Sequence, residues 1–316
     1  MAIPPAPTEM PRPQAPEVQA EMVATRTRPA YLHFLARDPV ALLAAAWLVL
    51  LIVFVVFGEW IVGDAAHGLN LRARALPFGS TEGGWINVLG TDALGRSVLA
   101  RIIVGTKVTL GIALTSAVLA LLIGTLIGLW AGFVGGWTGR VIMQISDVLQ
   151  SFPSILLAMV VLYVLTPSPV NLILVLTVGQ LPVYIRVARA EVLELRERLF
   201  VDAARVIGAN SRQIIRLHIA PMVAPTVINI VTIDFALIML SESSLSFLGI
   251  GVQAPTITWG LMVSQGKDYL DTAWWMAFFP GLMIMLTTLS INLMANWLRR
   301  VRDPRERWRY ERAKAS

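Results

Sequence analysis

The 316-residue chain contains no cysteine, and only 15% of its residues are charged. The first absence excludes disulfides, thiolate metal sites and cysteine nucleophiles. The second sets the chain apart from soluble domains, in which about 25% of residues are charged. Hydrophobic residues make up 56% of the chain, and its mean hydropathy is +0.68. Several uncharged runs exceed the roughly 20 residues that cross a bilayer, so the composition predicts a polytopic membrane protein.

Sequence motifs for nucleotide binding and hydrolysis are also missing. None of the three lysines lies in a Gly-x4-Gly-Lys-Ser/Thr string, the loop that holds ATP phosphates. Gly-x-Ser-x-Gly and His-Glu-x-x-His strings are absent, and the three scattered histidines form no metal-binding pattern. The sequence therefore predicts that the chain is not an enzyme and binds no metal or other cofactor itself.

Uncharged runs locate the membrane-spanning segments. The longest, residues 148–185, would form a helix of about 57 Å at 1.5 Å per residue, which exceeds the thickness of a bilayer. Proline ends helices, so Thr166-Pro-Ser-Pro169 is expected to divide this run into two spans. Gly135-Gly136 is expected to end the preceding helix. The sequence predicts six transmembrane helices: residues 39–58, one within 108–139, two within 148–185, one from Pro221 to about 247, and 272–298.

Lysine and arginine indicate the orientation, because cytoplasmic loops carry an excess of both. With both termini inside (N-in/C-in), 20 of the 26 lysines and arginines fall on the cytoplasmic side. The first 30 residues hold seven of the 18 prolines, with Glu, Gln and Thr between them, a composition typical of disorder. The predicted organisation is a disordered cytoplasmic tail (1–36), a first transmembrane helix (37–63), an extracytoplasmic loop (64–104), a transmembrane core (105–298) with a cytoplasmic loop at 190–221, and a basic cytoplasmic tail (299–316).

The cytoplasmic loop is the most polar internal stretch of the chain. Its apolar residues recur at three- and four-residue steps, which predicts an amphipathic helix over residues 191–206. One face of that helix is expected to carry Val192, Leu195, Leu199, Ala203 and Val206. Gly208 interrupts the pattern, and Asn210-Ser211 can cap a second helix. The pattern alone is compatible with a solvated connector or with two short helices at a bend, presented on the cytoplasmic face.

The stretch DAARVIGANSRQIIRLHIAP, from Asp202 to Pro221, resembles the EAA loop of the membrane subunits of ABC importers. In that pattern an acidic residue and two alanines precede a glycine, and a proline closes the loop. Here Asp202 replaces the usual Glu, and Ala220 replaces the usual Leu. The resemblance implies a coupling helix that docks on a cytosolic ATPase. It assigns to that coupling loop Asp202, Ala203, Ala204, Arg205, Gly208, Ile215, His218 and Pro221.

Four more stretches resemble the permease subunit of the dipeptide/oligopeptide/nickel ABC importer family, in its C-type form. They are LGTDALGRS (89–97), DVLQSFPSILLAM (147–159), SLSFLGIGVQAPTITWG (244–260) and Asp303-Pro304-Arg305. Ser97 stands where that family commonly has Asp. The similarity covers residues 31–305, which leaves only the two tails.

The resemblance implies an all-α, type I ABC importer transmembrane fold in the bacterial cytoplasmic (inner) membrane. It implies as partners a second permease subunit, two ABC ATPase subunits that bind ATP and Mg, and an extracytoplasmic solute-binding protein. Peptides or related small solutes are the expected cargo, with dipeptides, oligopeptides, nickel complexes, opines and sugars all left open. The basic tail is expected to face anionic lipid of the bilayer rather than nucleic acid.

Two acidic residues fall inside the fifth predicted helix. Asp234 lies about 13 residues into it, and Glu242 follows eight residues later, about 80° around the helix. A carboxylate at mid-bilayer costs about 2.5–3.5 kcal/mol. Both residues could therefore line a polar translocation path, and an ion-coupled secondary transporter or channel that uses them is the alternative function. In the other interpretation, Glu242 braces the outer end of the helix and Asp234 bonds a neighbouring Ser, Thr or Asn.

Three glycines recur at four-residue steps in the second predicted helix, at Gly124, Gly128 and Gly132. Such a stripe of small residues allows another helix to approach closely. The stripe could contact a second permease subunit, but packing within the chain is the favoured interpretation.

Overall fold

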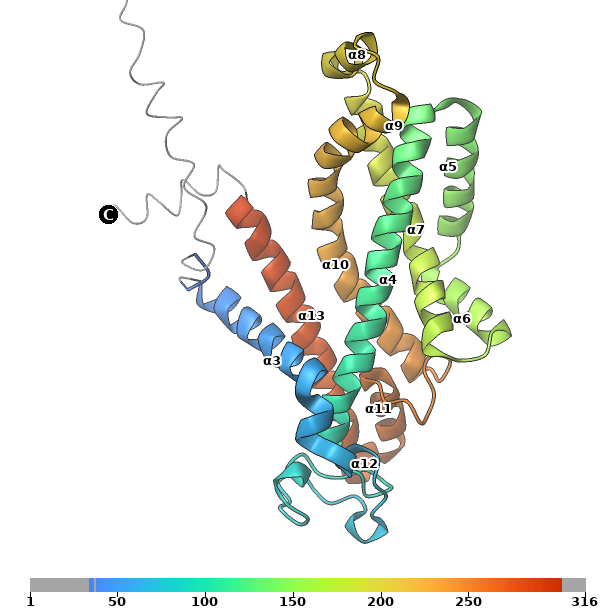
Figure 1. Ribbon diagram of the computed structural model, residues 1–316. Helices are drawn as coiled ribbons and strands as arrows, with labels where there is room; N and C mark the ends of the chain where they lie inside the picture. Colours follow the sequence, from blue (N-terminus) through green and yellow to red (C-terminus); the bar gives the residue numbers. More distant parts are fainter. Residues whose placement is uncertain (1–33, 37, 303–316) are drawn as a thin grey trace, which may run out of the picture.

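The computed structural model describes residues 34–36 and 38–302 (Figure 1). Helices form nearly all of the regular structure in these ranges, in which no strand occurs and one isolated bridge joins Thr91 to Ser97. The all-α prediction is confirmed. Nearly all of the predicted N-terminal tail lies outside the described residues, as do Asp303-Pro304-Arg305 and most of the basic C-terminal tail.

The α-helices of the described region differ in length, and the longer ones form the bundle in Figure 1. They are α3 (Pro39–Val62), α4 (Val98–Val134), α5 (Gly136–Ser151), α6 (Ser154–Val164), α7 (Pro169–Leu195), α8 (Leu199–Val206), α9 (Ser211–Ile214), α10 (Ala220–Phe247), α11 (Trp259–Gly266), α12 (Leu270–Ala273) and α13 (Trp275–Arg302). Within the described ranges, 5 helices are long and apolar enough to cross a membrane, and there are up to 6 spans if the bent pair α5–α6 counts as one.

Local backbone chemistry explains where the spans begin and end. The Ser97 hydroxyl caps α4 by accepting from the Ala100 amide, and Gly135, with φ of 65°, ends that helix. Ser168 caps α7, whose first residue is Pro169. The predicted helix ends at Gly135-Gly136 and at Thr166–Pro169 are therefore confirmed.

Two boundaries differ from the prediction. The third span is not a single helix, because Phe152 and Pro153 separate α5 from α6 at a bend of 89°. Proline disfavours helical backbone at the residue before it, and Phe152 is extended, with φ of −94° and ψ of 138°. In addition, α4 begins at Val98, so the last residues of the segment predicted as an extracytoplasmic loop are helical.

The glycine stripe of α4 packs against α7. A Cβ atom on Gly124 would lie 2.6 Å from Cβ of Tyr184, and one on Gly128 would lie 2.6 Å from the carbonyl oxygen of Ile185. A Cβ atom on Gly132 would lie 2.7 Å from Cβ of Val192. The two backbones are thus too close for any side chain between them, and the prediction that the stripe packs within the chain is confirmed.

Gly128→Ala is expected to destabilise the protein by about 1–3 kcal/mol, because the new methyl group would overlap backbone that cannot move aside. Gly111→Ala on the same helix is the matched control, since apart from the neighbouring backbone of α4 no atom lies within 4 Å of its added Cβ. The control is expected to gain up to about 1 kcal/mol through the higher helix propensity of alanine. Thermal melting of both variants in detergent tests this, and equal melting temperatures would contradict the tight contact.

Candidate functional site

The loop between α7 and α10 forms the tip of the bundle, where α8 projects beyond the other helices (Figure 1). The loop consists of α8, α9 and a π-helical turn over Ile215–Ile219 that runs directly into α10. The predicted helix over residues 191–206 is not continuous, because α7 ends at Leu195. Beyond this end, the Arg196 guanidinium donates to the carbonyl of Gly132 at 3.1 Å, which ties the turn to the end of α4.

A tight turn joins α8 to α9. Gly208 has φ of 87°, a left-handed conformation that favours glycine. The Gly208 amide donates to the Arg205 carbonyl and the Ala209 amide to the Ala204 carbonyl, both at 3.0 Å, which is a Schellman cap. Asn210 then starts α9 through a reciprocal capping box with Gln213. The predicted bend at Gly208 and the predicted cap at Asn210 are confirmed.

The exposed and buried faces of α8 differ from the predicted pattern. Val201 and Ala204 face the core, whereas Leu199 and Val206 are each 87% exposed. Ala203 is also exposed. Because the chain is not helical between the end of α7 at Leu195 and the start of α8, regular apolar spacing across this break does not place the residues on one helical face. The prediction of one common apolar face was therefore wrong.

The exposed tip contains half of the eight residues predicted for the coupling loop. Asp202, Ala203, Arg205 and Gly208 are all exposed there. The carboxylate of Asp202 pairs with Arg205 at 3.1 Å on the same helix, and both side chains are solvent-exposed. Such a pair contributes little to stability.

The remaining predicted site residues lie nearer the base of the loop. Ala204 is buried and Ile215 is half-buried. His218 is exposed, and its ring lies 6.3 Å from that of Phe200. Pro221 is exposed at the start of α10. The predicted residues of the loop are therefore divided between its exposed tip and the base that joins it to α10.

The most exposed apolar side chains of the loop were not predicted as site residues. Leu199, Val206 and Ile207 form an apolar tip, with Ile207 84% exposed. Exposed apolar clusters mark interaction sites. The apolar spacing that predicted a packed face includes Leu199 and Val206 but not Ile207.

The two intramembrane acids are both buried in α10. Glu242 is fully buried, and its carboxylate accepts from the Ser246 hydroxyl at 2.9 Å and from the Ser243 hydroxyl at 3.2 Å. Ser246 in turn accepts from the Val252 amide, so this network holds the loop that follows α10. Asp234 is 6% exposed beside Tyr184, and neither its Oδ2 nor the tyrosine hydroxyl has a hydrogen-bond partner of normal geometry.

The stretch of residues 89–97 forms a network at the opposite end of the bundle. Asp92 accepts from the backbone amides of Leu94 and Arg96 at 2.9 Å and from Nε of Arg96 at 2.7 Å. It also pairs with Arg101 of α4, which is 3% exposed and donates to Gln265 of α11 at 2.8 Å. A buried ion pair with this many partners ties the loop, α4 and α11 together.

Comparison with known proteins gives one family match. Residues 124–308 match the family described as binding-protein-dependent transport system inner membrane component. The Pseudomonas aeruginosa di/tripeptide transport system permease protein DppC is 38% identical over 259 residues, covering 81% of this chain and 85% of that protein. The Pectobacterium atrosepticum glutathione transport system permease protein GsiD is 33% identical, covering 92% and 95% of the two chains.

The fold also occurs in a solved structure. The inward-facing MetNI methionine ABC transporter has a chain with a TM-score of 0.51 and 20% identity, which covers 64% of this chain and 97% of that chain. This similarity shows the fold alone, and it agrees with the predicted type I importer architecture.

Asp92→Asn is expected to destabilise the protein by about 3–5 kcal/mol, because it leaves the charge of Arg101 buried without its partner. Glu59→Gln is the matched control, since Glu59 pairs with Lys107 at 3.0 Å but both side chains are more than half exposed. The control is expected to cost less than about 1 kcal/mol. Melting temperatures in detergent test this, and similar losses in the two variants would contradict a structural role for the buried pair.

Proposed function

This chain belongs to the family of binding-protein-dependent transport system inner membrane components, and we propose that it couples ATP hydrolysis by cytosolic ATPases to solute uptake through residues 190–221. The chain is a multi-pass inner membrane permease of an ABC importer and is not itself catalytic. ATP and Mg would be bound by the partner ATPases. The observation that carries the proposal is the apolar tip of Leu199, Val206 and Ile207 on a projecting loop.

The base of the loop supports this role because it is anchored in the bundle. Val201 and Ala204 of α8 and Ile214 of α9 share one apolar core cluster with Val192 of α7 and Val223 of α10. The π-helical turn also joins α9 to α10 without a break. A displacement of the tip would therefore move α7 and α10, the helices to which it is connected.

The remaining assembly follows from the family. We infer a second permease subunit that completes the path, two ABC ATPase subunits and an extracytoplasmic solute-binding protein. The distribution of lysine and arginine supports placing both chain ends and residues 190–221 in the cytoplasm and residues 64–104 outside. Peptides or related small solutes would be the cargo, as the names of the relatives suggest. Rocking of helix bundles about a central site would expose the path to each side in turn.

The alternative function, an ion-coupled secondary transporter or channel, is not favoured. That mechanism needs Asp234 and Glu242 to exchange ions or protons along a path. Glu242 is instead fully enclosed and bonded to two serines, and Asp234 lies buried against Tyr184. Accumulation of solute by the purified chain without an ATPase would revive the alternative.

Replacing two side chains of the apolar tip, as Leu199→Ser with Ile207→Ser, is expected to weaken binding of the ATPase subunits about thirtyfold. The estimate assumes that truncating central apolar contacts costs about 2 kcal/mol. Both side chains are largely exposed, so the melting temperature of the permease should not change. Co-purification of the ATPases and ATP-driven uptake in proteoliposomes measure the effect.

Leu71→Ser is the control for that experiment, because Leu71 is 66% exposed and lies in the segment predicted to be extracytoplasmic. It should leave ATPase binding unchanged. Full retention of the ATPases by the double variant would show that the tip is not the coupling surface.

A further inference from the structure

One surface of α5 is polar along its length. Four of its exposed polar side chains are spaced by four, three and four residues, which places them on one face: Arg140, Gln144, Asp147 and Ser151. Together α5 and α6 are long and apolar enough to cross a membrane. Polar side chains in a spanning segment face a bundle interior or a water-filled cavity rather than lipid.

Helix α7 adds an ion pair to this surface. Nη2 of Arg186 lies 2.8 Å from Oδ1 of Asp147, and the two side chains are 48% and 61% exposed. The pair therefore differs from the enclosed pair of Asp92 and Arg101. An exposed pair contributes at most about 1 kcal/mol, so another charged molecule can displace it at low cost.

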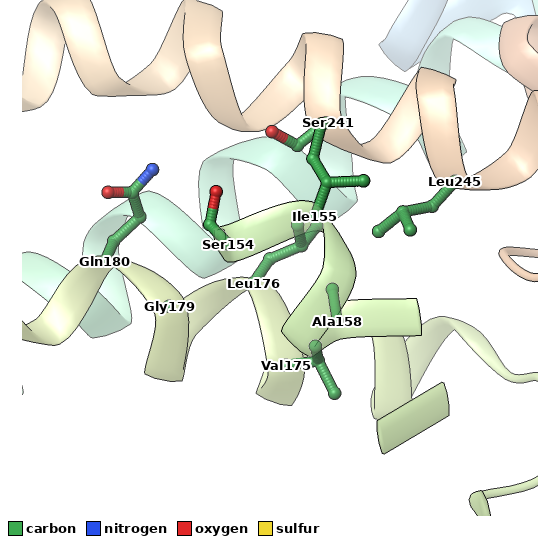
Figure 2. Close-up of a pocket in the computed structure, with 9 residues that line it drawn as sticks. All are labelled: Ser154, Ile155, Ala158, Val175, Leu176, Gly179, Gln180, Ser241 and Leu245. Atoms are coloured by element: carbon green, nitrogen blue, oxygen red, sulfur yellow. The ribbon is translucent and has the colours of Figure 1, made fainter. Parts of the chain in front are cut away.

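The polar surface continues into a small pocket at the bend between α5 and α6. Ser154, Gln180 and Ser241 contribute its polar side chains, from α6, α7 and α10. Figure 2 shows Ser154 and Gln180 extending from neighbouring elements toward the helix that carries Ser241. Among the described residues, the Gln180 amide and the Ser154 hydroxyl form no hydrogen bond, so both are available to a ligand.

A different surface of the bundle is apolar. Apolar side chains on α3 and α4 such as Ile52, Val56, Leu122 and Leu126 are between 54 and 66% exposed. Apolar side chains of this kind suit contact with lipid. The contrast between the two surfaces indicates that the face of α5 and α7 is the one that contacts water.

The polar side chains of α5, α7 and the adjoining pocket are here called the polar track: Arg140, Gln144, Asp147, Ser151, Ser154, Gln180 and Arg186. We propose that the polar track lines the inner part of the translocation path and binds solutes that carry both a carboxylate and an ammonium group. Arg186 offers a guanidinium to the carboxylate, and Asp147 offers a carboxylate to the ammonium group. Gln180 and Ser154 supply neutral hydrogen bonds farther along the track. The proposal rests on the proposed import function and identifies where, in this chain, the cargo makes contact.

Thiol labelling tests whether water reaches the track. The chain is suitable for this experiment because it contains no natural cysteine. Gln144→Cys, Ser151→Cys and Gln180→Cys are compared with Ile52→Cys and Leu122→Cys on the apolar surface. Inside-out membrane vesicles that contain the assembled complex are treated with a charged, membrane-impermeant methanethiosulfonate. Thiolate is the reactive form and needs water, so the track positions should react at least about tenfold faster.

Equal labelling rates at the two sets of positions would overturn the proposal, whether lipid or a partner subunit covers the track. Labelling requires neither ATP nor cargo. Its result is therefore independent of whether the chain couples to ATPases, and the two proposals can fail separately.

Peptide uptake tests the binding role. The double variant Asp147→Asn with Arg186→Gln is compared with Glu59→Gln with Lys107→Gln, a similarly exposed ion pair between α3 and α4. Proteoliposomes with all subunits receive a mixture of di- and tripeptides, and uptake is followed by mass spectrometry. The first double variant loses both charged contacts and should take up peptides at least about tenfold more slowly, since one charged hydrogen bond alone corresponds to about that factor.

ATPase binding and melting temperature should be unchanged in both double variants, because both ion pairs are exposed. Equal uptake by the two double variants would show that the exposed pair does not bind cargo. Failure of the unmodified complex to take up any of the peptides would contradict the assigned ligand class.

Discussion

The contact between α4 and α7 holds together the two ends of this molecule. Glycines at four-residue steps bring the two backbones so close that Gly128 meets the Ile185 carbonyl directly. At one end, α4 carries Arg101 into the network around Asp92. At the other end, α7 leads into α8, and Arg196 bonds the end of α4. Close backbone packing therefore gives a rigid connection between the network around Asp92 and the projecting loop.

Three sets of charged residues in the bundle lie in different environments, and each environment suits a different role. Asp92 and Arg101 are buried and bonded to each other and to neighbouring groups, which suits a structural tie. Glu242 is buried among serines and holds the loop after α10. Asp147 and Arg186 are paired but exposed, which leaves them available to other charged groups. In a membrane protein, exposure of a charge inside a spanning segment is the feature that indicates contact with water.

The loop combines an exposed apolar tip with a base that is packed into the core. Leu199 and Ile207 are available to a partner, whereas Val201 and Ile214 belong to a cluster that reaches α7 and α10. The Schellman cap at Gly208 stiffens the turn between the two short helices. A stiff loop of this kind can transmit displacement, while a solvated connector would absorb it. The geometry and the family membership thus support the same function from independent observations.

Local preferences of the backbone explain what the sequence alone determined. The uncharged runs, the helix end at Gly135, the bend at Gly208 and the cap at Asn210 depend only on neighbouring residues, so they were predictable. Tertiary packing decided the outward orientation of Leu199, the enclosure of Glu242 and the exposure of Asp147 and Arg186. These features depend on which helices meet and at what rotation, and periodicity in one segment carries no information about the helix that packs against it.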